Sequence, residues 1–398
     1  MSFAFIFSIE DPNPGQSGEL ALSAVQVMGP NDEYVVQADK DHTKFWAWEG
    51  QQALGCVFEY KDNDHDDHDD RKETEEAILP EDFNSKVKTG FQILPTRLQG
   101  IVDGHDGSLG GVMEGQGVPR TCDFDLTIRP LSGWGDDEDH VHGDDDDKAK
   151  SKQKSTAGWL ASYSVFEPHW QVTMADARAT GHATWNGKRY EFTDAPFYAE
   201  KNWGGSFPSK WYWVQCNSFQ GFTSPDGSSR LSLTAGGGIR KVPFGKTEDL
   251  GMVCVHHNGI FYEAVPWTGE MEWDVDPWGS WSFSARCTSG KRLFEVEVKA
   301  TCDGEGVALR APTEDLGLAY FCRDSFYADV ELSLYELVWD GEKKEHVRGG
   351  AIIEKVKSIN KTGAVEIGGG PYWNPWKGKS RMRQPLKALV KLPYLFKR

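Results

Sequence analysis

One short segment of the chain places four side chains with acid–base and binding chemistry next to one another. Glu200 is followed directly by Lys201, Asn202 and Trp203, a carboxyl group, an amine, an amide and an indole in succession. A carboxylic acid that burial keeps protonated can donate a proton, because desolvation disfavours its charged form. We therefore predict Glu200 as a catalytic acid and its three neighbours as substrate-binding residues. The alternative is an ion pair between Glu200 and Lys201 at a strand end, with Trp203 in the core.

A second carboxyl group with a similar setting is Glu263. It alternates along the chain with Phe261, Val265 and Trp267, so a strand would place it on an otherwise apolar face. Glu263 is therefore a second candidate for the catalytic acid. The alternative is a carboxylate at the rim of the protein, in contact with water.

Asp11, His169 and His257 are further candidates for the same chemistry. Asp11 follows Glu10 at the end of a strand-like run, where the pair can also form the turn before Pro12. The two histidines could orient or deprotonate a hydroxyl group. A histidine that is hydrogen-bonded within a sheet is the alternative for each.

Tryptophan residues predict an apolar pocket wall in the second half of the chain. In the run 210–217, KWYWVQCN, every second side chain shares one strand face, which carries two indoles and two amides. Core packing explains any single Trp as well, but a purely structural core face rarely carries two amides. The residues predicted to bind substrate on this wall are Trp211, Trp213, Gln215, Asn217, Trp267, Trp278 and Trp281.

Many short strands are expected to position these residues. The chain has 43 Gly and 19 Pro scattered between short alternating runs, which indicates many turns. The pairs Asn186-Gly187, Asn258-Gly259 and Asp340-Gly341 each separate two strand-like runs and predict hairpins. A meander of this length is expected to close into antiparallel barrels, since closure removes exposed edges. We therefore predict an all-β fold with two antiparallel β-barrels.

The length of 398 residues suits two domains. We place an N-terminal barrel at 1–155, a C-terminal barrel at 156–378 and a basic amphipathic tail at 379–398. Two acidic segments of low complexity, 61–76 and 135–154, lack apolar residues and are predicted to be solvated insertions in the first domain. Their histidines do not fix a ligand geometry, so we predict no metal site there.

The composition excludes several classes of function. A net charge of −18 is unsuited to a nucleic-acid partner. The seven cysteines contain no Cys-x-x-Cys pair, and no apolar run approaches the ~20 residues of a membrane span. The Gly-rich stretches 236–238 and 368–370 lack the spacing of a phosphate loop and predict tight turns.

The basic residues are concentrated at the C-terminal end. Residues 377–398 contain eight Lys and Arg, no acidic residue, and several apolar side chains between them. This mixture is typical of elements that lie at a lipid surface. The alternative is a basic tail that only aids solubility.

The run 194–217, DAPFYAEKNWGGSFPSKWYWVQCN, resembles the central signature of the tocopherol cyclase family and is too long for chance agreement. The resemblance covers nearly the whole chain. It continues in SFAFIFSIEDP from Ser2, GWGD from Gly133, KQKSTAGWLASYSVFEPHWQV from Lys152, HHNGIFYEAVPW from His256, WDVDPWGSW from Trp273, LRAPT from Leu309 and GGGPYWNPWKG from Gly368.

This resemblance implies an isomerase of the intramolecular lyase class in vitamin E biosynthesis. Such an enzyme converts methyl- or dimethyl-phytyl-benzoquinol to δ- or γ-tocopherol without a redox cofactor or metal. Its substrate is dissolved in lipid, at the plastoglobule or thylakoid surface of the chloroplast, with the cyanobacterial cytoplasm as the alternative. The family is similar to the lipocalin-like carotenoid hydratases, which implies two calycin-like barrels. It also implies that those hydratases carry an acidic residue at the position that corresponds to Glu200.

The chain departs from the family pattern before Ser2. Family members usually carry a further strand there, similar to Glu-Gly-Trp-Tyr-Phe, and plant members a transit peptide, so the first barrel is expected to lack its first strand. Two rival functions stay open. One is a lipocalin-like protein that carries a prenyl quinone or carotenoid without converting it, and the other is a hydratase or pericyclic cyclase of the same fold.

Overall fold

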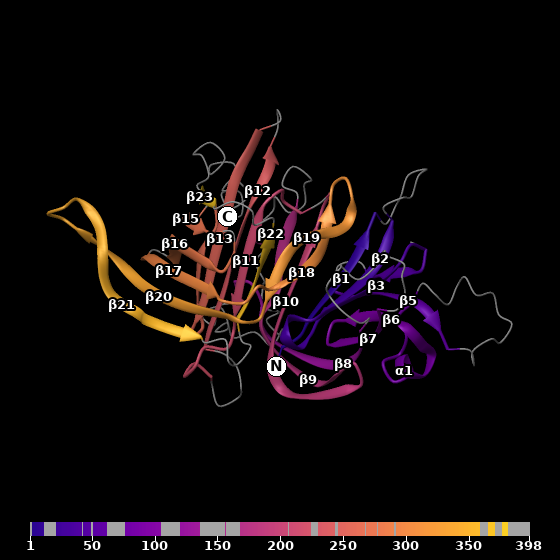
Figure 1. The fold of residues 1–398 in the computed structure, drawn as a ribbon. Helices are drawn as coiled ribbons and strands as arrows, with labels where there is room; N and C mark the ends of the chain where they lie inside the picture. The colour runs from indigo at the N-terminus through magenta and orange to yellow at the C-terminus, as the bar shows by residue number, and fades with distance from the viewer. Residues whose placement is uncertain are drawn as a thin grey trace, which may run out of the picture. The chain divides into compact units, whose positions relative to one another are not determined.

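The structure is a computed structural model, and its described part is nearly all β (Figure 1). Its strands form three antiparallel sheets. The described residues are 2–11, 21–41, 43–48, 51–61, 76–104, 120–135, 156, 168–205, 207–223, 230–242, 246–266, 268–276, 278–289, 292–358, 365–370 and 376–380. Most of each predicted insertion lies outside them, namely residues 62–75 and 136–154. Residues 381–398 of the predicted tail and Trp267 also lie outside them.

The first sheet has the order β1-β2-β3. It contains β1 (Ala4–Glu10), β2 (Leu22–Met28) and β3 (Tyr34–Asp39), with the short 3-10 helix η1 (Pro30–Asp32) between the last two. Phe5 and Phe7 alternate with polar and aliphatic residues along β1, so both rings point to one side. There Phe5 contacts Phe124 and Phe7 contacts Phe91, with ring centroids 4.3 and 5.0 Å apart.

The second sheet has the order β10-β9-β8-β7-β6-β5-β4. Its elements, with the short helix α1 (Phe83–Lys86), are β4 (Phe45–Ala47), β5 (Leu54–Tyr60), β6 (Val87–Leu94), β7 (Arg97–Asp103), β8 (Thr121–Ser132), β9 (His169–Trp185) and β10 (Lys188–Trp203). Gly181 lets the long strand β9 pass close to β8, because a Cβ atom there would lie 2.0 Å from the Asp125 carbonyl oxygen. The hairpin predicted at Asn186-Gly187 joins β9 to β10.

The third sheet runs β18-β19-β22-β11-β12-β13-β14-β16-β17-β20-β21, with β15 pairing both β16 and β23. Its first strands are β11 (Trp211–Cys216), β12 (Leu231–Val242), β13 (Lys246–His257), β14 (Ile260–Ala264), β15 (Glu270–Val275), β16 (Ser280–Ser289) and β17 (Arg292–Cys302). The others are β18 (Val307–Thr313), β19 (Gly317–Ser325), β20 (Ala328–Asp340), β21 (Glu345–Ser358), β22 (Val365–Gly370) and β23 (Trp376–Ser380). The hairpins predicted at Asn258-Gly259 and Asp340-Gly341 join β13 to β14 and β20 to β21.

The prediction of tight turns at the two Gly-rich stretches is wrong. Residues 236–238 lie in β12 and residues 368–370 lie in β22, where they flank β11 on both sides. A Cβ atom on Gly237 would lie 2.5 Å from the Tyr212 hydroxyl oxygen. Gly237 therefore leaves room for the large Tyr212 side chain of the central strand.

The chain divides into two compact units. The first comprises residues 1–130, 178–195 and 315–319, and the second comprises 131–177, 196–314 and 320–398. This division differs from a single cut after residue 155, because the β9–β10 hairpin contributes residues to both units. Within the second unit, a large core surrounds Tyr212, Trp281 and Phe283.

The all-β class with antiparallel sheets is confirmed by these pairings. Among the described residues the pairings form open paths, so closure of each unit into a barrel stays a prediction. The described residues also include no helix with the length and hydropathy that a membrane crossing requires.

Candidate active site

The carboxyl group of Glu200 is held by side chains from two neighbouring strands. Alternation along β10 places Tyr198, Glu200 and Asn202 on one face. The Tyr198 hydroxyl donates a hydrogen bond of 2.6 Å to Glu200 Oε2, and the indole N–H of Trp170 on β9 donates another of 2.6 Å to the same oxygen. Asn202 Nδ2 lies 3.4 Å from Oε1. Glu200 therefore has strong donors on one oxygen and a weak one on the other.

The backbone around Trp170 is fixed on both sides. The Thr156 hydroxyl donates to the carbonyl oxygen of Trp170, and the Thr173 hydroxyl donates to the Ala199 carbonyl oxygen over 3.0 Å. The Thr156 bond fixes the main chain at Trp170 and the Thr173 bond holds β9 against β10, so that the Trp170 indole reaches the carboxyl group on the adjacent strand.

Strand β11 brings a further aromatic ring to the same place. Trp213 lies with its ring centroid 5.5 Å from that of Tyr198. Asn217, buried just after β11, donates a hydrogen bond of 2.8 Å to the Phe197 carbonyl oxygen and ties β11 to β10. Three strands thus converge on one acid, which aromatic side chains surround.

Burial sets the protonation of this group. It raises the pKa of Glu200 above the ordinary 4.5, while hydrogen bonds from Tyr198, Trp170 and Asn202 lower it by less. Although the residue as a whole is half-buried, its carboxyl group is enclosed by these donors. Burial and the neighbouring Glu200 charge also raise the pKa of Tyr198 well above its ordinary value, so its hydroxyl stays protonated. The site can therefore hold a neutral carboxylic acid, the form that donates a proton.

Glu263 sits in a similar setting on β14. The indole N–H of Trp134 donates a hydrogen bond of 3.3 Å to its Oε2. Trp134 is fully buried, with its ring centroid 5.9 Å from Trp170 and 5.6 Å from Phe261. Burial raises the pKa of the Cys254 thiol, and the nearby Glu263 carboxyl group raises it further. The prediction of an acid on an apolar face thus agrees with its surroundings.

The end of β10 carries a stack of three side chains on the face opposite to Glu200. The ring of the buried His169 stacks on Trp203, with centroids 5.0 Å apart. The Lys201 ammonium lies 5.1 Å from the Trp203 ring centroid. Trp203 is 39% exposed, so the alternative that placed it in the core is wrong. Lys201 and Trp203 share one face of β10, opposite to that of Glu200, so Lys201 contacts this indole.

The remaining residues of the predicted wall lie on one face of β11 and beyond that strand. Gln215 is buried, and Trp211 contacts Phe207, with ring centroids 5.2 Å apart. Tyr212, between the two indoles in sequence, faces the large core, so the predicted alternation is confirmed. Trp278 donates its indole N–H to the Gly304 carbonyl oxygen over 2.7 Å.

The other predicted residues occupy separate places. Asp11 is exposed in the first unit. Trp281 lies in the large core and donates to the Asp276 carbonyl oxygen over 3.3 Å. His257 is the last residue of β13 and lies beside Asn258. Burial lowers the pKa of His257, and the positive charge of Arg230 lowers it further. Whether any of these residues contacts substrate stays a prediction.

Three side chains of the site were not among the predicted residues: Trp134, Trp170 and Tyr198. Tyr198 could have been found from its alternation with Glu200 along one strand. The positions of Trp170 and Trp134 depend on pairings between distant strands, for which the sequence carries no local signal. Their hydrogen bonds span 30 and 129 residues of the chain.

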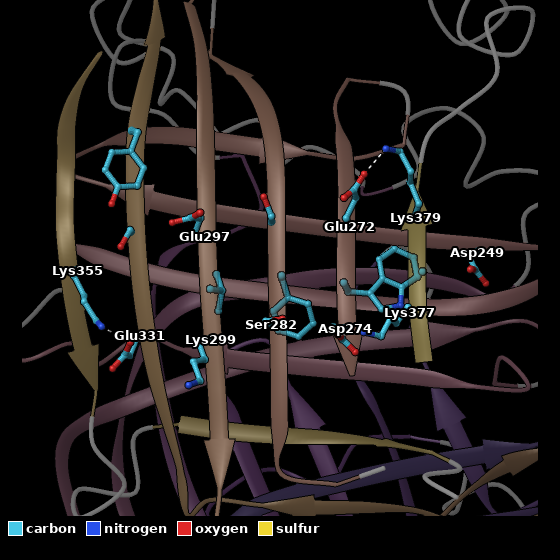
Figure 2. Close-up of a pocket in the computed structure, with 17 residues that line it drawn as sticks. Asp249, Glu272, Asp274, Ser282, Glu297, Lys299, Glu331, Lys355, Lys377 and Lys379 are labelled. Atoms are coloured by element: carbon cyan, nitrogen blue, oxygen red, sulfur yellow. Dashed lines mark hydrogen bonds and ion pairs between the residues drawn. The ribbon is translucent and has the colours of Figure 1, made fainter. Parts of the chain in front are cut away.

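A concave feature lies on the charged face of the third sheet (Figure 2). This groove of about 980 Å³ is crossed by pairs of opposite charge. Lys377 lies 2.6 Å from Asp274, and Figure 2 shows Lys355 pointing toward Glu331, at 2.9 Å. Such cross-strand ion pairs stabilise a solvated sheet face, and the groove does not suit an apolar substrate.

Comparisons with known proteins agree on one family. Residues 1–369 match the family model described as "Tocopherol cyclase-like". The chain is 36% identical to "Tocopherol cyclase, chloroplastic" of Zea mays, covering 98% of this chain and 76% of the relative. It is 38% identical to "Probable tocopherol cyclase, chloroplastic" of Oryza sativa subsp. japonica, with the same shares covered. No solved structure matches the chain significantly.

Proposed function

Because the chain belongs to the tocopherol cyclase-like family, we propose that it closes the chromanol ring of γ- or δ-tocopherol from the corresponding phytyl-benzoquinol. The reaction is an intramolecular addition of a phenol across a trisubstituted alkene. No electrons are gained or lost, so a redox cofactor has no role in it. Product and substrate are isomers, which places the activity in the intramolecular lyase class of isomerases.

The reaction needs a proton donor, a way to tolerate a tertiary cation and an aligned phenol. Transfer of a proton to one alkene carbon leaves positive charge on the other, the phenol oxygen bonds to that carbon, and the phenolic proton is released. The donor must be neutral before transfer. The burial of the Glu200 carboxyl group among hydrogen-bonding aromatic side chains is the observation that carries this proposal, because burial raises its pKa and so favours the neutral form.

The surrounding residues supply the other needs. The rings of Trp170, Tyr198 and Trp213 lie next to the acid, where their faces can stabilise a developing cation. Alignment of phenol and alkene can be worth roughly 7 kcal/mol or more. Polar residues at the end of β10, Lys201 and Asn202, are suited to hold the quinol hydroxyl groups.

Glu263 is the second candidate for the acid and the first for the acceptor of the phenolic proton. It is linked to the Glu200 site through the contact between Trp134 and Trp170. After one turnover Glu263 would hold the phenolic proton and Glu200 would be ionised, so the proton must return from Glu263 to Glu200, directly or through solvent, before the next turnover. His169 is a further candidate for the base, because it is buried at the start of β9, next in sequence to Trp170.

We place this activity in the chloroplast, at a plastoglobule or thylakoid surface, where a lipid-soluble quinol is available. The two relatives, both called chloroplastic, support this location. A peripheral contact through 379–398 would bring an otherwise acidic protein to that surface. A nucleic-acid partner is not expected for a chain with a net charge of −18.

One incubation tests the proposal against its rivals. The full chain is mixed with a phytyl-benzoquinol in detergent or lipid vesicles, and the products are separated by mass and on a chiral column. A single chromanol enantiomer is the expected product. Recovery of bound, unchanged quinol would instead identify a carrier, and a product heavier by one water would identify a hydratase. A racemic chromanol that also forms without protein would contradict catalysis.

A further inference from the structure

We infer that the acidic hydrogen of Glu200 sits on Oε1, and that Trp170 and Tyr198 are positioning residues that hold it there. This inference rests on the proposed function and adds to it the atom from which the proton leaves. It also gives a role to two side chains outside the predicted set.

The donors on Oε2 determine the assignment. An indole N–H can only donate, so the 2.6 Å bond from Trp170 makes Oε2 an acceptor. In a neutral carboxylic acid the carbonyl oxygen is the better acceptor, and it has two lone pairs. The Tyr198 hydroxyl, also at 2.6 Å, fills the second of these. The hydrogen of the neutral acid is thereby directed to the other oxygen.

Oε1 has the surroundings that a donating atom requires. Its contact among the described residues is Asn202 Nδ2, at a long 3.4 Å. Rotation of that amide would present its oxygen, which can accept from Oε1–H. Because Asn202 is exposed, a ligand that displaces the amide would meet the acidic hydrogen. The indole N–H of Trp213 comes near the carboxyl group but lacks hydrogen-bond geometry with any described atom.

Few groups that titrate or carry charge lie against this acid in the described part of the chain. On β10 they are Tyr198, which is in direct contact, and Lys201, whose ammonium lies on Trp203. The charge of Cys254, on β13, further raises the pKa of Tyr198. From β9 and β11 the acid meets indoles, which do not titrate, while the buried His169 of β9 stacks on Trp203 at the opposite face of β10. A change at Tyr198 should therefore be reported mainly by Glu200 itself.

The test removes one donor and keeps the ring. Tyr198→Phe deprives the ionised carboxylate of a hydrogen bond, which raises the pKa of Glu200 further, and it frees a lone pair on Oε2. The hydrogen can then occupy either oxygen. We expect kcat for chromanol formation to fall roughly tenfold with KM nearly unchanged. Because a neutral acid acts, activity is lost as pH rises through its pKa, so the loss should move to higher pH.

A matched control is Tyr212→Phe. Tyr212 is buried, but its hydroxyl faces the large core and lies 4.0 Å from Met271 Sδ. This variant should keep the kcat and pH profile of the wild type. Equal pH profiles for Tyr198→Phe and Tyr212→Phe would overturn the inference, whatever their kcat values.

An infrared measurement separates this inference from the proposed function. The carbonyl band of neutral Glu200 is identified by its loss in Glu200→Gln and followed with pH in the full chain. In Tyr198→Phe the band should move to higher frequency, since its oxygen loses a donor, and persist to higher pH. A band unchanged by Tyr198→Phe would contradict the assignment even if chromanol forms. If no chromanol forms, a shifted band still supports the assignment while the proposed function fails.

Discussion

Trp134 and Trp170 lie edge to face, with ring centroids 5.9 Å apart, and each donates its indole N–H to a different carboxyl group. Trp170 bonds Glu200 and Trp134 bonds Glu263. The two acids are therefore connected by one continuous aromatic contact within the second unit. Edge-to-face pairs add about 0.5–1.5 kcal/mol beyond their buried area, which favours a fixed arrangement of both indoles.

Replacement of the acid tests its role most directly. We expect Glu200→Gln to abolish chromanol formation while the melting temperature hardly changes, because the amide keeps the shape of a neutral acid and has no acidic hydrogen. Product formation and thermal unfolding are measured on the same preparation. Glu272→Gln, at an exposed ion pair of the sheet face, serves as the control. Turnover near the wild-type level in Glu200→Gln would transfer the donor role to Glu263.

The carboxyl group of Glu10 should make the free energy of unfolding depend on pH. Burial raises the pKa of Glu10 from 4.5 to about 7, against a hydrogen bond with Ser8. A group whose pKa is raised in the folded state contributes its full stabilisation of the folded protein below its unfolded pKa. This contribution is lost as pH rises through the folded pKa. The wild type should therefore lose stability between pH 4.5 and about 7, whereas Glu10→Gln should lose less.

The measurement for Glu10 is urea unfolding at several pH values across this window. Glu59→Gln is the control from the same unit, because Glu59 forms an exposed ion pair with Lys88. It should follow the wild type. Parallel curves for all three proteins would show that Glu10 titrates alike in the folded and unfolded chains.

The glycines beside β11 should be intolerant of any side chain. A Cβ atom on Gly237 would lie 2.5 Å from the Tyr212 hydroxyl oxygen, in a packed core. We expect Gly237→Ala to lower the free energy of unfolding by about 1–3 kcal/mol. Gly341→Ala, at a hairpin loop with no atom within 4 Å of the added carbon, should cost far less. Similar losses in the two variants would contradict the steric account.

The basic tail can be tested without damage to the sheet. Lys377 and Lys379 belong to β23 and pair with Asp274 and Glu272, so a truncated chain should end at Ser380. We expect the full chain to float with anionic vesicles more than the truncated one, and the difference to shrink with added salt. Equal flotation of the two chains at low salt would exclude an anchor in residues 381–398.

The local pattern of the sequence was sufficient for the strand faces and hairpins. Along β11, alternation alone separates Trp213 from Tyr212, and the structure places them on opposite faces. Asn258 and Gly259 adopt φ values of 50° and 77°, as a tight hairpin turn requires. Glu200 and Glu263 were predicted from sequence as candidate acids, Glu200 from its polar and aromatic neighbours and Glu263 from an apolar strand face, and their catalytic roles stay predictions.

The tertiary structure decided which side chains meet. It placed Trp170 and Tyr198 on one oxygen of Glu200, brought Trp134 to Glu263 across 129 residues, and set Gly237 against Tyr212. The physical reason is that side-chain direction in a strand follows from a two-residue period, which the sequence carries locally. The pairing of strands instead depends on the burial and hydrogen bonds of the whole sheet, and it alone brings distant residues into contact.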